Sequence, residues 1–378
     1  MKKIAILGGT FNPVHVEHVK MAVAAIKELE LDKLIIVPTF LPPHKNVVPA
    51  SGADRINMLK IAFKGVSGVE ISDFETLNGG KSYSYITTEH FAEEYKGARL
   101  YMIVGGDMLA DFKTWKYPER ILAAASLAVF RRQDYFCDLG SEREYFIKRF
   151  GTDFMLLNYV GKTVSSTAIR TYLAFGLKPN GVPEGVFDYI KERGVYPADE
   201  YQRYILSRLP IKRVIHTANV VICALKKAKE LGLDYEKVRI AATLHDCAKY
   251  ADVRNYRDFS LPQDVPAPVV HAFLGAYIAE KELGISDGEI LDAIRYHTSG
   301  KAEMSTLAKL IFVADMIEEG RTYQGVEKLR AEYDKDFENC FKECLKEEVL
   351  HLVNKKEYIY AETLNAYDYY VKSRRENE

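Results

Sequence analysis

Histidine and aspartate side chains recur along the second half of the sequence in a pattern that could hold a metal ion. The residues concerned are His216, His245, Asp246, His271, His297 and Asp315. A lone histidine on an apolar helix is more often a core residue than a ligand. Four histidines spread over successive helical patterns, with an adjacent aspartate and a distal one, favour a metal site. Imidazole and carboxylate together suit Fe, Mn, Zn or Mg ions, which could activate water or, as a pair, clamp two oxygen atoms.

Each of these six residues lies within a segment of helical periodicity or at its end. His245 and Asp246 are adjacent, and on a helix their side chains point about 100° apart, so both could reach one ion between them. His216 and Asp315 would then close the site from neighbouring helices.

A second group of residues follows the first apolar run of the chain. It consists of Gly8, Gly9, Thr10, Phe11, His15 and His18. Glycines after a buried strand allow backbone amides to approach a phosphate, and the start of the next helix offers unpaired N–H groups. The spacing of the two histidines predicts one face of the first helical turn, where they could donate hydrogen bonds to a reacting phosphate. The alternative is a helix-capping and core pair. The segment matches neither GxGxxG nor a Walker motif.

The overall composition is that of an ordinary globular protein. The 378 residues are 48% apolar and 28% charged, and this length predicts two or three domains. A net charge of −1 gives no sign of a nucleic-acid or anionic-membrane partner. The apolar stretch 4–7 is too short for the core of a signal peptide and is interpreted as a buried strand. The five cysteines show no paired spacing, which favours a reducing cytoplasm.

The periodic segments that must position these residues change character near Pro197. Before it, short apolar runs predict strands at Lys3–Leu7, Leu34–Val37, Val69–Ile71, Leu100–Val104, Leu127–Arg131 and Phe154–Leu157, separated by helices such as Glu17–Leu29 and Ala53–Phe63. After it, helices are predicted at Val214–Leu231, Glu236–Tyr250, Val269–Leu283, Asp287–His297, Leu307–Ile317 and Phe337–Val353. The expected fold is α/β with a doubly wound parallel sheet over residues 1–197, followed by an all-α domain over 198–378.

The first half resembles a known enzyme family. The run GGTFNPVHxxH is similar to the HxGH signature of the bacterial nicotinate mononucleotide adenylyltransferases, and the run VSSTAIR at 164–170 is similar to their second signature, ISSTxIR. The motifs PPHK at 42–45, GGKSY at 79–83, GGD at 105–107 and KTW at 113–115 follow the order of that family over residues 1–196. The resemblance implies a Rossmann-like nucleotidyltransferase.

The resemblance also implies roles for individual residues. His15 and His18 would contact the phosphates of ATP, and the turn of Ser165, Ser166 and Thr167 would hold the triphosphate together with Arg170. Lys45 would reach a phosphate, Asp107 would lie on the adenosine side, and Trp115 would stack on the nicotinate ring. A capping Ser-Ser-Thr turn with a downstream arginine suits phosphate binding on physical grounds as well.

The reaction implied is adenylyl transfer, in which the mononucleotide phosphate attacks the α-phosphorus of ATP and pyrophosphate leaves. This step requires positioning and charge stabilisation with Mg²⁺, and no protein nucleophile. One position departs from the family, because Glu17 replaces the glycine between the two histidines. We expect either that its side chain turns to solvent or that the ATP site is weakened. Because the other motifs are intact, we expect activity to survive.

The second half resembles the HD phosphohydrolase superfamily. The order RxxH, HDxAK, H, YHTSG and ADMIEEGR is similar to the subfamily of symmetrical dinucleoside tetraphosphate hydrolases, over residues 200–360. The resemblance implies that His216, His245, Asp246 and Asp315 bind a divalent transition metal, Fe or Mn. His271 and His297 would complete a second metal position or touch phosphate, and Lys249 and Arg321 would pair with phosphate oxygens of diadenosine tetraphosphate.

Alternatives remain open for both halves. The first half could be another nucleotidyltransferase, such as one that uses pantetheine phosphate, although Trp115 and the GGKSY segment argue against it. The second half could be a broader nucleotidase or phosphodiesterase. A non-enzymatic first half is also an alternative, in which Glu17 has produced a nucleotide-binding module that regulates the hydrolase. The expected ligands are small nucleotides, without nucleic acid or membrane, and a homo-oligomer is compatible with the sequence.

Overall fold

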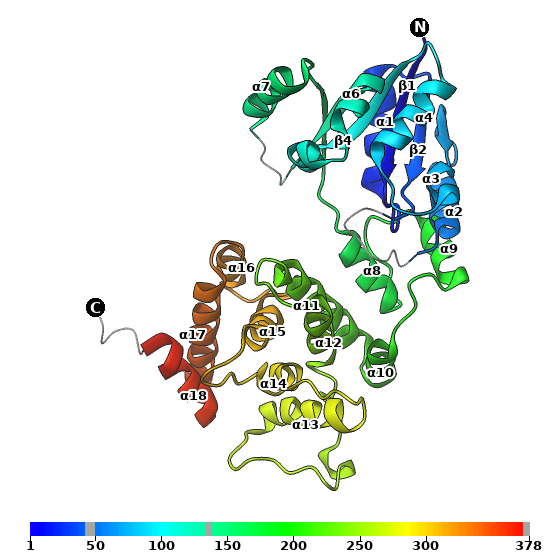
Figure 1. Cartoon of the computed structure of the whole chain (residues 1–378). Helices are drawn as coiled ribbons and strands as arrows, with labels where there is room; N and C mark the ends of the chain where they lie inside the picture. Colours follow the sequence, from blue (N-terminus) through cyan, green and yellow to red (C-terminus); the bar gives the residue numbers. More distant parts are fainter. Residues whose placement is uncertain (42–49, 134–137, 373–378) are drawn as a thin grey trace. The chain divides into compact units, whose positions relative to one another are not determined.

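The computed structural model describes residues 1–41, 50–133 and 138–372. Contacts divide the chain into two compact units (Figure 1). The first consists of Met1–Arg170 and Lys178–Pro197, and the second of Thr171–Leu177 and Ala198–Glu378. Residues 171–177 therefore belong to the second unit, although they precede the boundary expected at Pro197. Among the described residues, no helix has the length and apolar character needed to cross a membrane.

The first unit contains a parallel sheet of six strands in the order β3-β2-β1-β4-β5-β6. The strands are β1 (Lys3–Gly9), β2 (Lys33–Pro38), β3 (Val69–Ile71), β4 (Arg99–Gly105), β5 (Ser126–Arg132) and β6 (Met155–Gly161). Each contains or overlaps one of the predicted apolar runs. The prediction of a doubly wound parallel sheet is confirmed. The strands before β4 are added on one side of β1 and the later ones on the other, so the order of strand addition reverses between the parallel neighbours β1 and β4. The crevice at the carboxyl ends of two such strands is where this class of fold binds ligands.

Helices connect these strands and follow the last of them (Figure 1). They are α1 (Val16–Leu29), α2 (Gly52–Ala62), α3 (Phe74–Asn78), α4 (Ser84–Glu94), α5 (Gly106–Asp111), η1 (Phe112–Thr114), α6 (Pro118–Ala124), α7 (Leu139–Phe150), α8 (Ser166–Ala174) and α9 (Glu184–Arg193). The central strands are buried, which explains why they are continuous apolar runs rather than alternating ones.

The described residues of the second unit form helices joined by turns and loops, with no strand among them. Its elements are α10 (Glu200–Arg208), α11 (Ile211–Ala228), α12 (Tyr235–Leu244), η2 (Val253–Asn255), α13 (Ala267–Lys281), α14 (Gly288–Tyr296), α15 (Thr306–Ile317), α16 (Val326–Lys335), α17 (Phe337–Lys355), α18 (Ala361–Tyr367) and η3 (Asp368–Lys372). Helix α15 is central, because α11, α12, α14, α16 and α17 all contact it. Its run from Leu310 to Ala314 is buried. The prediction of an all-α second domain is confirmed.

One predicted helix is too long. The pattern 236–250 predicted a continuous helix, but α12 ends at Leu244, and residues 245–250 form turns. The Nδ1 atom of His245 lies 2.7 Å from the carbonyl oxygen of Ala242, and the amide of Cys247 bonds back to Leu244 rather than one residue further. These bonds tighten the backbone and end the helix, so that the His-Asp pair lies just beyond it.

Candidate functional sites

All six residues proposed as metal ligands come together in the second unit. His216 lies on α11, His271 on α13 and Asp315 on α15, whereas His297 directly follows α14. The ligand atoms form three overlapping groups, each with its atoms within 4.8 Å of one another. These groups are His216, His245 and Asp246; His245, His297 and Asp315; and Asp246, His271 and His297.

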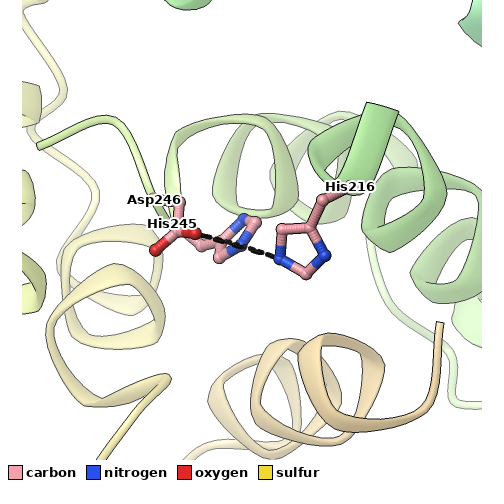
Figure 2. Close-up of side chains that lie close together, drawn as sticks. All are labelled: His216, His245 and Asp246. Atoms are coloured by element: carbon pink, nitrogen blue, oxygen red, sulfur yellow. Dashed lines mark hydrogen bonds and ion pairs between the residues drawn. The ribbon is translucent and has the colours of Figure 1, made fainter. Parts of the chain in front are cut away.

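The closest contacts within this His/Asp cluster join imidazoles to carboxylates. The Nε2 atom of His216 lies 3.0 Å from Oδ1 of Asp315, and that of His271 lies 3.1 Å from Oδ1 of Asp246. The other carboxylate oxygen of Asp246 is 3.9 Å from Nε2 of His216 and 3.8 Å from Nε2 of His245 (Figure 2). Asp246 is 2% exposed, so water cannot solvate its charge, and the surrounding groups must compensate it.

The orientation of two imidazoles fixes which nitrogen can bind a cation. The Nδ1 atoms of His245 and His297 each lie 2.7 Å from a backbone carbonyl oxygen, of Ala242 and Ile294 respectively. A carbonyl only accepts, so both Nδ1 atoms carry hydrogen and both Nε2 atoms, when the rings are neutral, present a lone pair. The Nε2 atoms of His245 and His216 are 3.4 Å apart, and those of His271 and His297 are 3.3 Å apart.

Nitrogen lone pairs that converge this closely repel each other unless a proton or a cation lies among them. Neutral imidazole with its second nitrogen held by a carbonyl is the form in which histidine binds metals. The donor set therefore fits a divalent metal ion.

Burial and charge shift the pKa values of the ligands in different directions. Burial would lower the pKa of His216, but its hydrogen bonds to Asp315 and Glu318 raise it above the ordinary value. Burial lowers the pKa of His245 to about 3 and also lowers the pKa of His271, so both rings are neutral near pH 7. Burial would raise the pKa of Asp315, but the hydrogen bond from His216 and the charge of Arg321 hold that pKa below its ordinary value. The pKa of Asp246 is likewise lowered against the effect of burial, by interactions with the neighbouring histidines.

Three basic side chains surround the cluster. The Nζ atom of Lys249 lies 3.1 Å from Nε2 of His271, and Arg321 donates to Oδ1 of Asp315 over 2.5 Å. These two residues were expected to meet phosphate oxygens, and in the structure both contact the His/Asp cluster itself. Sequence reasoning gave no role to Arg213, which donates to Oδ2 of Asp246 over 2.9 Å.

Sequence reasoning also missed a buried carboxylate beside the cluster. Glu318 is 3% exposed, and its Oε1 atom lies 3.0 Å from Nδ1 of His216. Its only signal in the sequence is its place three residues after Asp315, within the segment ADMIEEGR.

The turn that the sequence predicts to bind phosphate lies at the end of β1, where ligands of this fold class are expected. A Cβ atom built on Gly8 would meet no heavy atom within 4 Å, so the space beside the turn is open. The carbonyl of Thr10 accepts from the guanidinium of Arg55, and the buried ring of Phe11 meets the ring of His18 edge-on at 4.9 Å. Arg55 therefore holds the backbone of the turn through Thr10, while the space beside Gly8 is open.

The two histidines of the turn differ in position. Helix α1 begins at Val16, so His15 precedes it in extended conformation and His18 lies in its first turn. The prediction that both lie on one face of the first helical turn holds for their rings, which stack 3.6 Å apart, although His15 caps the helix instead of lying within it. The amide of His15 donates to Nδ1 of His18 over 3.2 Å. Since Nδ1 accepts, the neutral ring of His18 carries its hydrogen on Nε2 and can donate it to a phosphate oxygen.

The second signature lies against the first. The hydroxyl oxygen of Ser165 accepts from the amide of Ala168 over 3.1 Å and so caps α8, whose first residues are Ser166 and Thr167. Arg170 donates to the carbonyl of Asn12 over 2.9 Å and to the hydroxyl of Thr167 over 3.1 Å. Two motifs about 150 residues apart in the sequence thus meet at one place.

The remaining residues expected to bind the nucleotides are Asp107, Trp115 and Lys45. Asp107 lies in the first turn of α5 and is half-buried. Trp115 is half-buried against the core, with its ring 5.2 Å from that of Phe112. The structure therefore shows the packing interpretation of this tryptophan directly. Lys45 lies outside the described residues.

Glu17, which replaces the family glycine, neither turns to solvent nor points into open space. It is 3% exposed, and its Oε2 atom accepts from the hydroxyl of Tyr159 over 2.8 Å and from the amide of Lys162 over 3.1 Å. Its Oε1 atom pairs with Lys20. Its charge is thus compensated on the β6 side of α1. The expectation of a solvent-facing side chain is wrong.

Arg55 was not identified from the sequence. It is 1% exposed and donates to the carbonyl oxygens of Thr10, Thr39, Ala50 and Phe40. Its charged guanidinium therefore connects the phosphate-binding turn to the chain that leaves β2. A lone arginine in an amphipathic helix gives no sequence signal for this role.

Comparison with known proteins agrees with this two-part arrangement. The cytidylyltransferase-like family model matches residues 6–172, and the HD domain model matches residues 213–320. A Mycoplasma genitalium protein named "Probable nicotinate-nucleotide adenylyltransferase/Ap4A hydrolase" is 28% identical over 325 residues, covering 85% of this chain and 88% of that protein. A Clostridium tetani protein named "Probable nicotinate-nucleotide adenylyltransferase" is 37% identical over 199 residues, covering 52% of this chain and 100% of that protein.

Solved structures are also similar to part of this chain. One of them is a Clostridium acetobutylicum protein described as a predicted HD superfamily hydrolase involved in NAD metabolism, with 30% sequence identity and a TM-score of 0.44. The match covers 46% of this chain and 97% of that chain.

Proposed function

This chain belongs to the nicotinate-nucleotide adenylyltransferases and carries an HD domain in its second half, and from this premise we propose that it is a bifunctional nucleotide enzyme. The first unit transfers the adenylyl group of ATP to nicotinate mononucleotide, giving deamido-NAD and pyrophosphate. The second unit hydrolyses diadenosine tetraphosphate to two molecules of ADP.

The proposal of adenylyl transfer rests on the contact between the two signature motifs, in which Arg170 donates to the carbonyl of Asn12. A phosphate oxygen of the mononucleotide forms a bond to the α-phosphorus of ATP while the bond to the β-phosphate oxygen breaks. His18, through Nε2–H, and Arg170 supply donors for the charge that develops, and the amides of Gly8, Gly9 and the start of α1 add to them. His15, Thr10 and Phe11 shape this turn.

Further residues complete the proposed nucleotide site. Ser165, Ser166 and Thr167 would hold the triphosphate with Lys45, and Mg²⁺ would offset its charge. Asp107 would lie on the adenosine side and Trp115 on the nicotinate ring. Because Glu17 is satisfied on the β6 side of α1, a degenerate, purely regulatory first unit is not favoured.

The proposal of diadenosine tetraphosphate hydrolysis rests on the His/Asp cluster. His216, His245, Asp246 and Asp315 would hold a divalent ion, Fe or Mn, and His271 and His297 would complete a second position. When bound, such an ion supplies positive charge to phosphate oxygens and lowers the pKa of water. Lys249 and Arg321, which contact Asp246 and Asp315 respectively, would add positive charge for the polyphosphate.

Product analysis by chromatography on the full-length protein tests both activities. One reaction contains ATP, Mg²⁺ and nicotinate mononucleotide, and another contains diadenosine tetraphosphate with Mn²⁺ or Fe²⁺. We expect deamido-NAD in the first and ADP as sole product in the second. If the first reaction yields no dinucleotide, the transferase proposal fails. If ATP or nicotinate mononucleotide then changes the rate of hydrolysis, the first unit is a regulatory module. With AMP, ATP or a mixture in the second, the hydrolase is a broader nucleotidase.

A further inference from the structure

The histidines of the His/Asp cluster are oriented in two different ways. His245 and His297 are held by backbone carbonyls of their own helical turns. His216 is instead held by a side chain from another element, because its Nδ1 atom lies 3.0 Å from Oε1 of Glu318, the residue that follows α15. The orientation of His216 thus depends on residues that can be changed without touching the backbone.

Glu318 is itself held at its second oxygen. Its Oε2 atom accepts from Nδ2 of Asn219 over 2.8 Å and from the amide of Gly320 over 2.5 Å. Asn219 lies one helical turn after His216 on α11, so this helix supplies two of the three hydrogen-bond partners of the carboxylate. With one oxygen bonded to the imidazole and the other to two N–H groups, the carboxylate has a single orientation.

The chain of hydrogen bonds continues to Tyr172. Since Nδ2 of Asn219 must donate to the carboxylate, its Oδ1 atom points the other way, and there it accepts from the hydroxyl of Tyr172 over 2.5 Å. Every donor in this series meets an acceptor, which fixes the amide and the carboxylate together. Tyr172 belongs to the second unit but precedes the HD-domain match at residues 213–320.

We propose that Glu318, held by Asn219 and Tyr172, is a positioning residue that sets the orientation and tautomer of the metal ligand His216. This inference rests on the proposed metal site. Each nitrogen of His216 faces a carboxylate, Glu318 at Nδ1 and Asp315 at Nε2. Glu318 keeps a hydrogen on Nδ1, so Nε2, which points toward Asp315 and Asp246, is the nitrogen that would give up its hydrogen to bind an ion. Without Glu318, the ring loses the bond that selects this tautomer and can rotate away from the other ligands.

The test is Mn²⁺ binding to the full-length protein, measured by titration calorimetry after removal of bound metal. We expect Glu318→Gln to weaken Mn²⁺ binding by about 10- to 100-fold, the usual effect of removing such a partner. The matched control is Glu319→Gln, which removes the neighbouring exposed carboxylate and should bind as wild type. Tyr172→Phe, which removes only the outermost hydroxyl, should produce a smaller loss in the same direction.

A second readout distinguishes positioning from general damage. In the metal-free protein with ¹⁵N-labelled histidine, Glu318→Gln should change the imidazole nitrogen shifts of His216 and leave those of His245 and His297, which the backbone holds. If Glu318→Gln does not fold, the Mn²⁺ affinity and the His216 nitrogen shifts of Tyr172→Phe test the positioning role instead.

Two negative outcomes have different meanings. Unchanged affinity and unchanged His216 shifts in variants of a protein that binds Mn²⁺ would overturn the positioning role alone. A wild-type protein that binds neither Mn²⁺ nor Fe²⁺ would overturn the metal site, and the positioning role with it.

Discussion

The two candidate sites of this chain are built from different parts of the polypeptide. The His/Asp cluster consists of buried side chains that helices and turns of the second unit direct toward one region. The nucleotide site consists mainly of a backbone turn, two helix starts and long basic side chains. A side-chain site depends on a few atoms that nothing else replaces, whereas a backbone site depends on what holds the backbone in place. The consequences of mutation should therefore differ between the two units.

The largest expected effect is at the centre of the His/Asp cluster. Asp246 belongs to two of its three ligand groups, so Asp246→Asn should reduce diadenosine tetraphosphate hydrolysis by more than about 100-fold, the upper range for loss of a mere supporting partner. Adenylyl transfer should change little, because the residue belongs to the second unit and the signature motifs belong to the first. The control is Asp252→Asn, an aspartate of the same unit paired with Arg254. Retained hydrolysis in Asp246→Asn would remove the cluster from the reaction.

A variant of the nucleotide site should show the reverse pattern, with adenylyl transfer lost and hydrolysis retained. His18→Ala should lower kcat of adenylyl transfer by about 100- to 1000-fold, the effect of removing one preorganised donor from a developing anion. Hydrolysis and metal content should be unchanged. His351→Ala, at an exposed position of α17, is the control. An equal loss of hydrolysis in His18→Ala would contradict the assignment of separate chemistry to the two units.

The third variant tests the claim that the nucleotide site depends on what holds its backbone. Arg55→Met preserves much of the side-chain volume but removes the donors for four carbonyl groups. Since hydrogen bonds to charged groups contribute about 1.5–3 kcal/mol each and are not additive, the first unit should lose about 3 kcal/mol of unfolding free energy. Urea unfolding monitored by Trp115 fluorescence measures it. Lys60→Met, exposed on the same helix, should have little effect. Stability equal to wild type would show that Arg55 does not hold the turn.

The same difference explains what the sequence could predict. The His/Asp cluster was predictable residue by residue, because its chemistry lies in side-chain type and each ligand lies within a segment of helical periodicity or at its end. The six strands were predictable because parallel strands buried on both faces are continuous apolar runs. Helix α16 was not predicted, since it is largely polar and only Val326, Leu329 and Tyr333 are buried.

Buried charges were the main failure of sequence reasoning. Arg55, Glu318 and Glu17 all lie in polar or amphipathic contexts where a charged residue is normally exposed. Their burial is possible because partners from distant segments satisfy them, and a single sequence does not reveal such partners. For Arg55 these partners are backbone carbonyls, which every residue type supplies, so no pattern of side chains could have indicated them.

Glu17 gives the smallest and most specific prediction, because it is a buried side chain placed within the backbone site. Burial would raise its pKa, but Lys20, Tyr159 and the amide of Lys162 together lower it from the ordinary 4.5. A lowered folded-state pKa contributes stability that is present above the unfolded value and lost as the pH falls through the folded value. Glu17→Gln, which keeps an acceptor but no charge, should therefore be about 1 kcal/mol less stable than wild type at pH 7.

The stability difference between wild type and Glu17→Gln should shrink as the pH falls below 4.5. The unfolded wild-type chain takes up a proton at Glu17 first, and the folded chain does so only at lower pH. Urea unfolding of the first unit at several pH values measures this difference. Glu17→Gly, which restores the residue typical of the family, should be less stable than Glu17→Gln, since the hydroxyl of Tyr159 and the amide of Lys162 then lack their acceptor. A gap between wild type and Glu17→Gln that stays constant with pH would show that the charge of Glu17 does not stabilise the fold. If Glu17→Gly proved more stable than wild type, the glutamate would be a cost to the backbone site rather than one of its supports.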